Sequence, residues 1–152
     1  MSESTQLHSS SDILLVEDNP NDLELTLHAL SHNNLANKVH VARDGAEALD
    51  FLFCQGPFAD RNPADVPAVV MLDLKLPKID GLEVLRRIKG DTRLRHIPIV
   101  ILTSSREDRD VVDSYNLGVN SYIVKPVQFE SFTEAVRQLG LYWVLLNQRP
   151  TI

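Results

Sequence analysis

Five short apolar runs, each rich in valine and isoleucine, recur along the chain. Four of them are nearly continuous in apolar residues, whereas a strand with one solvated face would alternate apolar and polar positions. Continuous short runs are typical of strands that are covered on both faces. The predicted strands span residues 12–17, 38–43, 68–72, 97–103 and 121–125.

Between the runs, apolar residues recur every three or four positions, which is the spacing of a helix with one buried face. Asn19-Pro20 predicts the start of the first helix, because proline fits the first helical position. Ser105 with Asp108 three residues later resembles a capping box, and Gly118 is the predicted end of the same helix. The predicted helices span about residues 20–30, 45–54, 81–90, 105–118 and 128–146.

Strand and helix alternate five times, which favours an α/β fold with a doubly wound, five-stranded parallel sheet. A single domain is predicted over residues 11–147. The polar segment 1–10 and the short segment 148–152 are predicted to be tails. The loop 55–67 contains three prolines, and we predict a surface insertion there rather than a binding loop.

Composition narrows the class of protein. With 152 residues, 43% of them apolar, the chain is long enough for one domain with a substantial core. A net charge of −6 disfavours binding of nucleic acid or of an anionic membrane across the whole surface. No apolar run approaches the roughly 18 residues of a membrane span. The single cysteine, Cys54, cannot form an internal disulfide and indicates a reducing cytoplasm.

Polar residues follow the predicted strands at their C-terminal ends, where open parallel sheets bind ligands. They are Glu17, Asp18, Asp73, Thr103 and Lys125. Any one of them alone would more often be a turn, strand or surface residue. Three carboxylates packed together, however, repel one another unless a cation lies among them. Their combination therefore predicts a metal site.

Mg²⁺, or Mn²⁺ in its place, is the cation that these carboxylates favour. Mg²⁺ usually takes one or two carboxylates together with waters and phosphate oxygens. Calcium is disfavoured because the short loop has no EF-hand pattern, and zinc because His and Cys do not cluster here. Thr103 and Lys125 add a hydroxyl and an ammonium, which suit an anion. The site is thus predicted to hold a phosphoryl group beside the metal.

Four segments in this order, LLVEDN, MLDLKLPKIDG, VILTSS and YIVKP, resemble the receiver domain of two-component response regulators. The resemblance extends from about residue 12 to residue 146, and the loop 55–67 makes the separation of Asp18 from Asp73 longer than usual. VARDGAEAL and NSYIVKPVQF are further similar to stand-alone receivers that partner phytochrome-type histidine kinases, including those of cyanobacteria. The resemblance implies the flavodoxin-like strand order 2-1-3-4-5.

The resemblance also implies a role for each acid. Asp73 would be the phosphoacceptor, which takes a phosphoryl group from a histidine of a sensor kinase. Glu17 and Asp18 would hold Mg²⁺ together with Asp73, and the main-chain carbonyl of Lys75 would be a further ligand.

Three more residues have implied roles on the phosphoryl side. Lys125 would neutralise charge as the transition state forms, and Thr103 would hydrogen-bond the attached phosphoryl group. Tyr122 would be a switch residue that moves inward with Thr103. The Lys125-Pro126 bond is expected to be cis, which is inexpensive only before proline.

Alternatives from other classes stay open at this point. A phosphatase with an aspartyl-phosphate intermediate would need a second acid two residues after Asp73, where Lys75 stands. A flavodoxin-like cofactor binder would not require this set of residues, and a P-loop nucleotidase is excluded because no GxxxxGK[ST] occurs. A non-phosphorylated, protein-binding receiver is disfavoured because all five residues that the resemblance assigns to the site are present. They are Glu17, Asp18, Asp73, Thr103 and Lys125. We expect no enzymatic activity beyond self-phosphorylation and self-dephosphorylation.

The last predicted helix, 128–146, suggests how a signal would leave the domain. Its apolar residues form a heptad-like seam, and its end, LYWVLL, is apolar on all sides. Because no output domain is expected after residue 146, output is expected through protein binding. We predict a homodimer through the helix 105–118, the strand 121–125 and the last helix. The predicted centre of this interface comprises Tyr142, Trp143 and Leu146.

Overall fold

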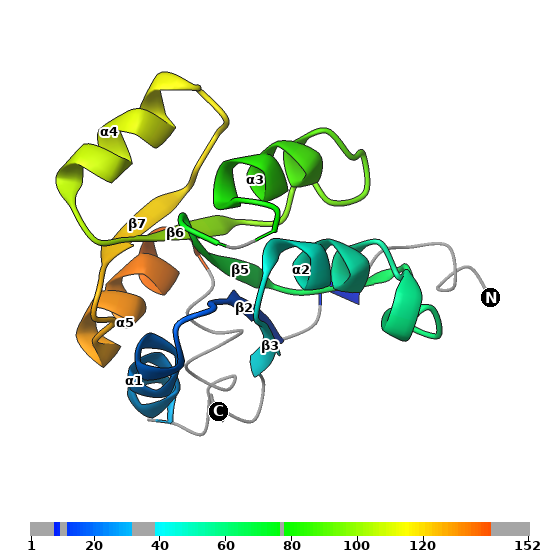
Figure 1. Ribbon diagram of the computed structural model, residues 1–152, viewed down its shortest axis with the longest axis horizontal. Coiled ribbons are helices and arrows are strands. Elements are labelled where there is room, and N and C mark those ends of the chain that lie inside the picture. The colour runs from blue at the N-terminus through cyan, green and yellow to red at the C-terminus, as the bar shows by residue number, and fades with distance from the viewer. Residues whose placement is uncertain (1–7, 10–11, 32–38, 77, 141–152) are drawn as a thin grey trace, which may run out of the picture.

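A five-stranded parallel sheet forms the centre of the protein in the computed structural model, which describes residues 8–9, 12–31, 39–76 and 78–140 (Figure 1). The strands are β2 (Ile13–Val16), β3 (Val39–Ala42), β5 (Val69–Asp73), β6 (Ile99–Thr103) and β7 (Ser121–Val124). Their order in the sheet is β3-β2-β5-β6-β7. All five predicted strands and the predicted order 2-1-3-4-5 are confirmed.

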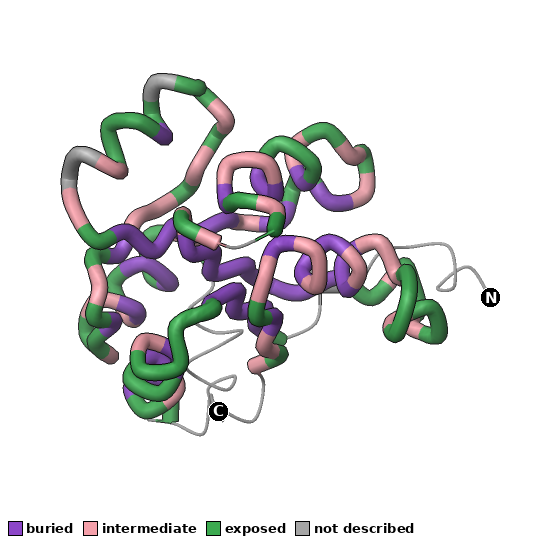
Figure 2. Tube along the Cα trace, in the orientation of Figure 1, coloured by how far each residue is buried: buried purple, intermediate pink, exposed green. Residues whose placement is uncertain are grey.

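Helices cover both faces of this sheet. The helices α1 (Pro20–Leu30) and α5 (Phe129–Gln138) pack on one face. The other face is covered by α2 (Gly45–Leu52), α3 (Gly81–Lys89) and α4 (Arg106–Ser114) (Figure 1). Every residue of β2, β5 and β6 is buried, and Figure 2 shows buried residues concentrated along these strands. The doubly covered sheet explains why the apolar runs are continuous.

Two residues of the segment predicted to be a tail take part in the fold. The short strand β1 (His8–Ser9) pairs in parallel with β4 (Asp65–Val66), a strand within the loop after α2. The same loop contains a 3-10 turn, η3 (Gly56–Phe58).

Two arginines fix this loop to the end of α2. Arg61 donates to the carbonyl of Phe51, and Arg93 donates to that of Leu52 and, at 2.7 Å, to that of Pro63. The last carbonyls of a helix lack partners within the helix. The arginine side chains donate to two of these last carbonyls and so hold the loop against the domain.

The predicted C-terminal limits of two helices are wrong. α5 ends at Gln138 rather than Leu146, and Gly140 follows with φ of 74°, a left-handed conformation that suits a helix end and a residue without Cβ. Residues 141–146, with Tyr142, Trp143 and Leu146, lie outside the described residues. α4 ends at Ser114, before Gly118, because Asn116 already turns left-handed with φ of 53°.

Two other local predictions, the N-cap of α4 and one cis peptide bond, are confirmed. Ser105 is the N-cap of α4 and its hydroxyl accepts a hydrogen bond from the Asp108 N–H at 3.3 Å. The Lys125-Pro126 peptide bond is cis. Within the described part of the chain, no helix combines the length and apolarity of a membrane span.

Candidate functional site

The predicted site residues meet at the C-terminal edge of the sheet. Glu17 directly follows β2, Asp73 and Thr103 end β5 and β6, and Lys125 directly follows β7. Backbone hydrogen bonds fix these positions, since the Lys125 N–H donates to the Thr103 carbonyl at 2.7 Å. Because β2, β5, β6 and β7 lie in sequence across the sheet, the four side chains converge on one place.

Three acids form the centre of the site. One carboxylate oxygen from each of Glu17, Asp18 and Asp73 lies within 4.8 Å of the others. Glu17 is fully buried, Asp73 is 4% exposed and Asp18 is exposed to solvent. Burial, and after it the adjacent Asp73, together raise the pKa of Glu17 to about 8. The charged form of Glu17 is therefore disfavoured at this place unless a cation compensates its charge.

This donor set fits a hard divalent cation. The Oε1 atom of Glu17 is buried without a hydrogen-bond partner among the described residues, although the Lys125 ammonium lies 3.5 Å away in an ion-pair contact. The exposed Asp18 leaves one side open to water, as Mg²⁺ requires. The N–H of Lys75 donates to Asp73 Oδ1 at 3.2 Å, which holds the loop after β5 close to the acids.

Lys125 carries the positive charge of the site. Its Nζ lies 3.0 Å from Asp73 Oδ2, 3.0 Å from Asp22 Oδ2 and 3.5 Å from Glu17 Oε1. Burial alone would lower the pKa of Lys125, but the hydrogen bonds to Asp22 and Asp73 outweigh burial and hold it above its ordinary value. Lys125 is thus an ammonium at neutral pH.

Sequence reasoning missed Asp22. It lies in the first turn of α1, not at a strand end, so a search of strand ends passes over it. The topology could have indicated Asp22. A helix that directly follows a strand starts at the C-terminal edge of the sheet, where the site lies.

Thr103 contributes a hydroxyl that is not in use. The residue is 1% exposed, and its Oγ1 makes no hydrogen bond with any residue that the structure describes. An unsatisfied buried hydroxyl costs free energy unless a partner arrives. Thr103 therefore suits an incoming acceptor such as a phosphoryl oxygen.

Two further predicted residues lie at the margin of the site. Tyr122 donates its hydroxyl hydrogen to Asp113 of α4, and the Arg109 guanidinium lies 4.7 Å from the centre of its ring. Lys75 extends its side chain into solvent, with Nζ 4.0 Å from Asp108 Oδ2. A cavity of about 490 Å³ opens beside the acids and is lined by Asp18, Leu74, Lys75, Leu76, Asp80 and Leu82.

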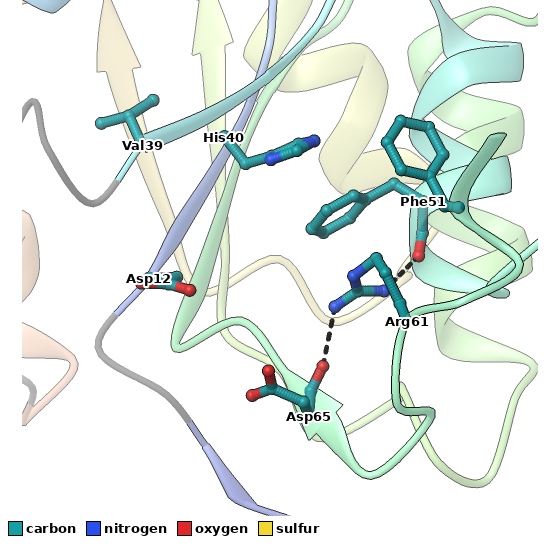
Figure 3. A pocket seen from close by; sticks show the side chains of 7 residues that line it. Asp12, Val39, His40, Phe51, Arg61 and Asp65 are labelled. Atoms are coloured by element: carbon teal, nitrogen blue, oxygen red, sulfur yellow. Dashed lines mark hydrogen bonds between the residues drawn. The ribbon is translucent and has the colours of Figure 1, made fainter.

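A second cavity, of about 350 Å³, lies near the starts of β2 and β3 (Figure 3). His40 stacks on Phe51 with 4.0 Å between ring centres, and the Arg61 guanidinium lies 3.7 Å from the centre of the same phenyl ring. Arg61 also donates to the carbonyls of Phe51 and Asp65 (Figure 3). These contacts give Arg61 a structural role in holding the loop after α2.

The chain is similar in sequence and in fold to several known proteins. The family model described as the response regulator receiver domain matches residues 13–137. Response regulator Rcp1 of Synechocystis sp. (strain ATCC 27184 / PCC 6803 / Kazusa) is 38% identical over 132 residues, which are 87% of this chain and 88% of Rcp1. The crystal structure of the Mn²⁺-bound form of response regulator Rcp1 matches with a TM-score of 0.68 and 36% identity, covering 91% of this chain and 98% of the other.

Two further solved structures are also similar. The bacteriophytochrome response regulator AtBRR matches with a TM-score of 0.83 and 60% identity, covering 93% of this chain and all of the other. The phosphorylated cyanobacterial phytochrome response regulator RcpA matches with a TM-score of 0.71 and 37% identity, covering 94% of this chain and all of the other.

Proposed function

The chain belongs to the response regulator receiver domain family, and from this premise we propose that it accepts a phosphoryl group on Asp73 and signals by changed protein binding. One observation carries the proposal. A carboxylate that is 4% exposed lies 3.0 Å from an ammonium and beside two further acids at the edge of a parallel sheet. A purely structural role would not require so much unbalanced charge in so little space.

The proposed transfer needs few chemical participants. An oxygen of Asp73 attacks the phosphorus of a phosphohistidine, the new O–P bond forms as the P–N bond breaks, and the histidine nitrogen leaves with the electron pair. Lys125 neutralises charge on a phosphoryl oxygen, and the Thr103 hydroxyl donates a hydrogen bond to another. Glu17, Asp18 and Asp73 would hold Mg²⁺ or Mn²⁺, with the Lys75 carbonyl as a further ligand. That ion would supply further neutralisation of the phosphoryl charge.

The proposed phosphodonor is a sensor histidine kinase of phytochrome type. The support is the similarity to AtBRR, a bacteriophytochrome response regulator, at 60% identity, and to the phytochrome response regulator RcpA. We expect the exchange to take place in the cytoplasm.

A homodimer through α4, β7 and α5 belongs to the same proposal. Large apolar residues are exposed here: Val111 of α4 and Tyr115, the residue after α4, are each 48% exposed, and Val124 of the edge strand β7 is 59% exposed. Contact with a second copy of the chain would bury these apolar side chains. The expected mass in solution at micromolar concentration is that of a dimer, and a monomeric mass would refute this part.

The decisive experiment is phosphate transfer from labelled candidate kinases to the chain. We expect rapid, Mg²⁺-dependent labelling of the wild-type chain and none of Asp73→Asn, which keeps the size of the side chain but not the nucleophile. Equal labelling of Asp73→Asn would show that the phosphoryl group is attached elsewhere.

A further inference from the structure

Lys125 has a second short carboxylate contact for which the proposed function has no role. Its Nζ lies 3.0 Å from Asp22 Oδ2, as close as it lies to Asp73 Oδ2. Asp22 comes from α1 and Asp73 from β5, so the ammonium bridges a helix and the sheet. Building on the proposed function, we propose that Asp22 is a positioning residue that holds the Lys125 ammonium in place during phosphoryl transfer.

Asp22 is not needed to cap its own helix. An acid at the third helical position often accepts a hydrogen bond from the N–H of the capping residue. Here the cap is Asn19, and its N–H donates to Glu17 Oε2 at 3.2 Å instead. The Asn19 side chain in turn accepts from the Asp22 N–H at 3.0 Å. The Asp22 carboxylate is thereby left to contact Lys125.

Lys125 needs a fixed partner because its other partners change role during the reaction. A lysine ammonium is a compact charge on a flexible four-carbon stem, so its position depends on what it contacts. When an oxygen of Asp73 bonds to phosphorus, Asp73 loses negative charge, and Glu17 is assigned to the metal. Asp22 alone keeps both its charge and its place.

The surroundings of the Asp22–Lys125 pair favour such a role. The side chains of Lys125 and Asp22 are only 16% and 31% exposed, so solvent screens their attraction less than it screens a surface pair. A positive charge held in position before the reaction stabilises the transition state more than one that must reorient. The opposite possibility is that Asp22 draws Lys125 away from the phosphoryl group, in which case its removal would speed the reaction.

The test compares phosphorylation by acetyl phosphate with Mg²⁺ present, in which the O–P bond to Asp73 forms as acetate leaves with its electron pair. We expect Asp22→Asn to lower the rate at saturating donor by about tenfold, the effect of one charge-assisted hydrogen bond, in a variant that stays folded at the assay temperature. Asp22→Glu should restore part of the rate. The matched control is Glu24→Gln, which removes one exposed acid from the same helix and should leave the rate unchanged.

A double-mutant cycle with Lys125→Met tests whether Asp22 acts through Lys125. In that background Asp22→Asn should cause no further loss, because the contact is already gone. A wild-type or faster rate in Asp22→Asn would overturn the inference. A full further loss of rate in the Lys125→Met background would overturn it as well. The proposed function would still stand in these cases, because the wild-type chain would still be labelled. If the wild-type chain accepts no phosphoryl group from any donor, the proposed function fails and the inference fails with it.

Discussion

At the scale of single residues, the site contains buried polar atoms that lack hydrogen-bond partners among the described residues. Thr103 is the clearest case, because its hydroxyl is buried and has no hydrogen-bond partner among the described residues. A buried, unsatisfied hydroxyl typically costs about 1–3 kcal/mol. Such a cost is common at functional sites, where a group is placed for a ligand rather than for the fold.

Thr103→Val should therefore separate stability from function. Valine keeps the branched shape and removes the hydroxyl, so we expect the free energy of unfolding to rise by about 1 kcal/mol in urea titrations. Phosphorylation by acetyl phosphate should become slower in the same variant. Thr133→Val is the control, because the Thr133 hydroxyl donates to the Phe129 carbonyl at 2.8 Å and its loss should not stabilise. A destabilised Thr103→Val would contradict the argument.

Asp44 gives a residue-scale prediction for pH. Its Oδ1 accepts from the Glu47 N–H at 2.7 Å, which caps α2, and its Oδ2 lies 3.2 Å from Lys78 Nζ. The hydrogen bond from Glu47, and then Lys78, lower the pKa of Asp44 against the opposing effect of burial. A lowered pKa means that its stabilisation is present above the unfolded-state pKa of about 4 and is lost as pH falls through the folded-state value.

We expect Asp44→Ala to lose about 1 kcal/mol of unfolding free energy at pH 7, typical of a lost N-cap. The difference from wild type should shrink as the pH falls below about 4, where the wild-type carboxyl is progressively protonated. Urea unfolding of both proteins between pH 7 and the acid range measures this difference in unfolding free energy. Asp44→Asn, which keeps an acceptor without the charge, should lose less at pH 7. A difference that stays constant with pH would contradict the assigned pKa direction.

The sequence predicted the residues that strand ends position and missed the one that a helix turn positions. Glu17, Asp73, Thr103 and Lys125 could be predicted because parallel strands place their ends at one edge of the sheet. Asp22 could not, because its role depends on the direction of its side chain and on the use of the Asn19 N–H by Glu17. Such competition between neighbouring hydrogen bonds cannot be read from residue spacing.

At the scale of elements, the start of α3 is pressed against the end of β5. A Cβ added at Gly81 would lie 2.5 Å from the carbonyl oxygen of Asp73 and 2.6 Å from that of Leu74. Both atoms belong to the backbone and cannot rotate away. The close approach therefore requires glycine, and it ties the helix to the strand that carries Asp73, the proposed phosphoacceptor.

Gly81→Ala should destabilise the protein by about 1–3 kcal/mol or more through overpacking and should slow phosphorylation because Asp73 moves. Gly140→Ala is a useful comparison. An added Cβ there meets nothing within 4 Å, but φ of 74° is unfavourable for alanine, so we expect a loss of roughly 1 kcal/mol with normal phosphorylation. Equal effects of the two substitutions on phosphorylation would contradict the packing argument.

Elements were predicted where a local pattern decides them and missed where distant contacts do. The end of α5 could have been read from Gly140, but the apolar periodicity that continues through residues 141–146 outweighed that signal. The regular structure of the loop after α2, with η3 and β4, could not have been predicted. It depends on Arg93, whose partners are carbonyls 30 and 41 residues away in the sequence.

At the scale of the whole molecule, the fold concentrates negative charge at one edge of its sheet. Lys125 is the ammonium within reach of Glu17, Asp22 and Asp73 in the described part of the chain, and Asp18 adds a further charge at the rim. The net charge of −6 for the whole chain adds to the repulsion. A cation that binds only the folded chain should therefore stabilise all of it.

Mg²⁺ should accordingly raise the unfolding free energy in proportion to the logarithm of its concentration above the dissociation constant. The gain should reach about 2.7 kcal/mol at one hundred times that constant, and a chelator should reverse it. Asp18→Asn should abolish most of the gain without destabilising the core, because Asp18 is exposed. The control is Asp60→Asn, which removes an exposed acid from the loop after α2 and should leave the gain intact. Equal gains in both variants would mean that the ion binds elsewhere. Asp18, unlike Asp60, belongs to the cluster in which three carboxylate oxygens lie within 4.8 Å of one another.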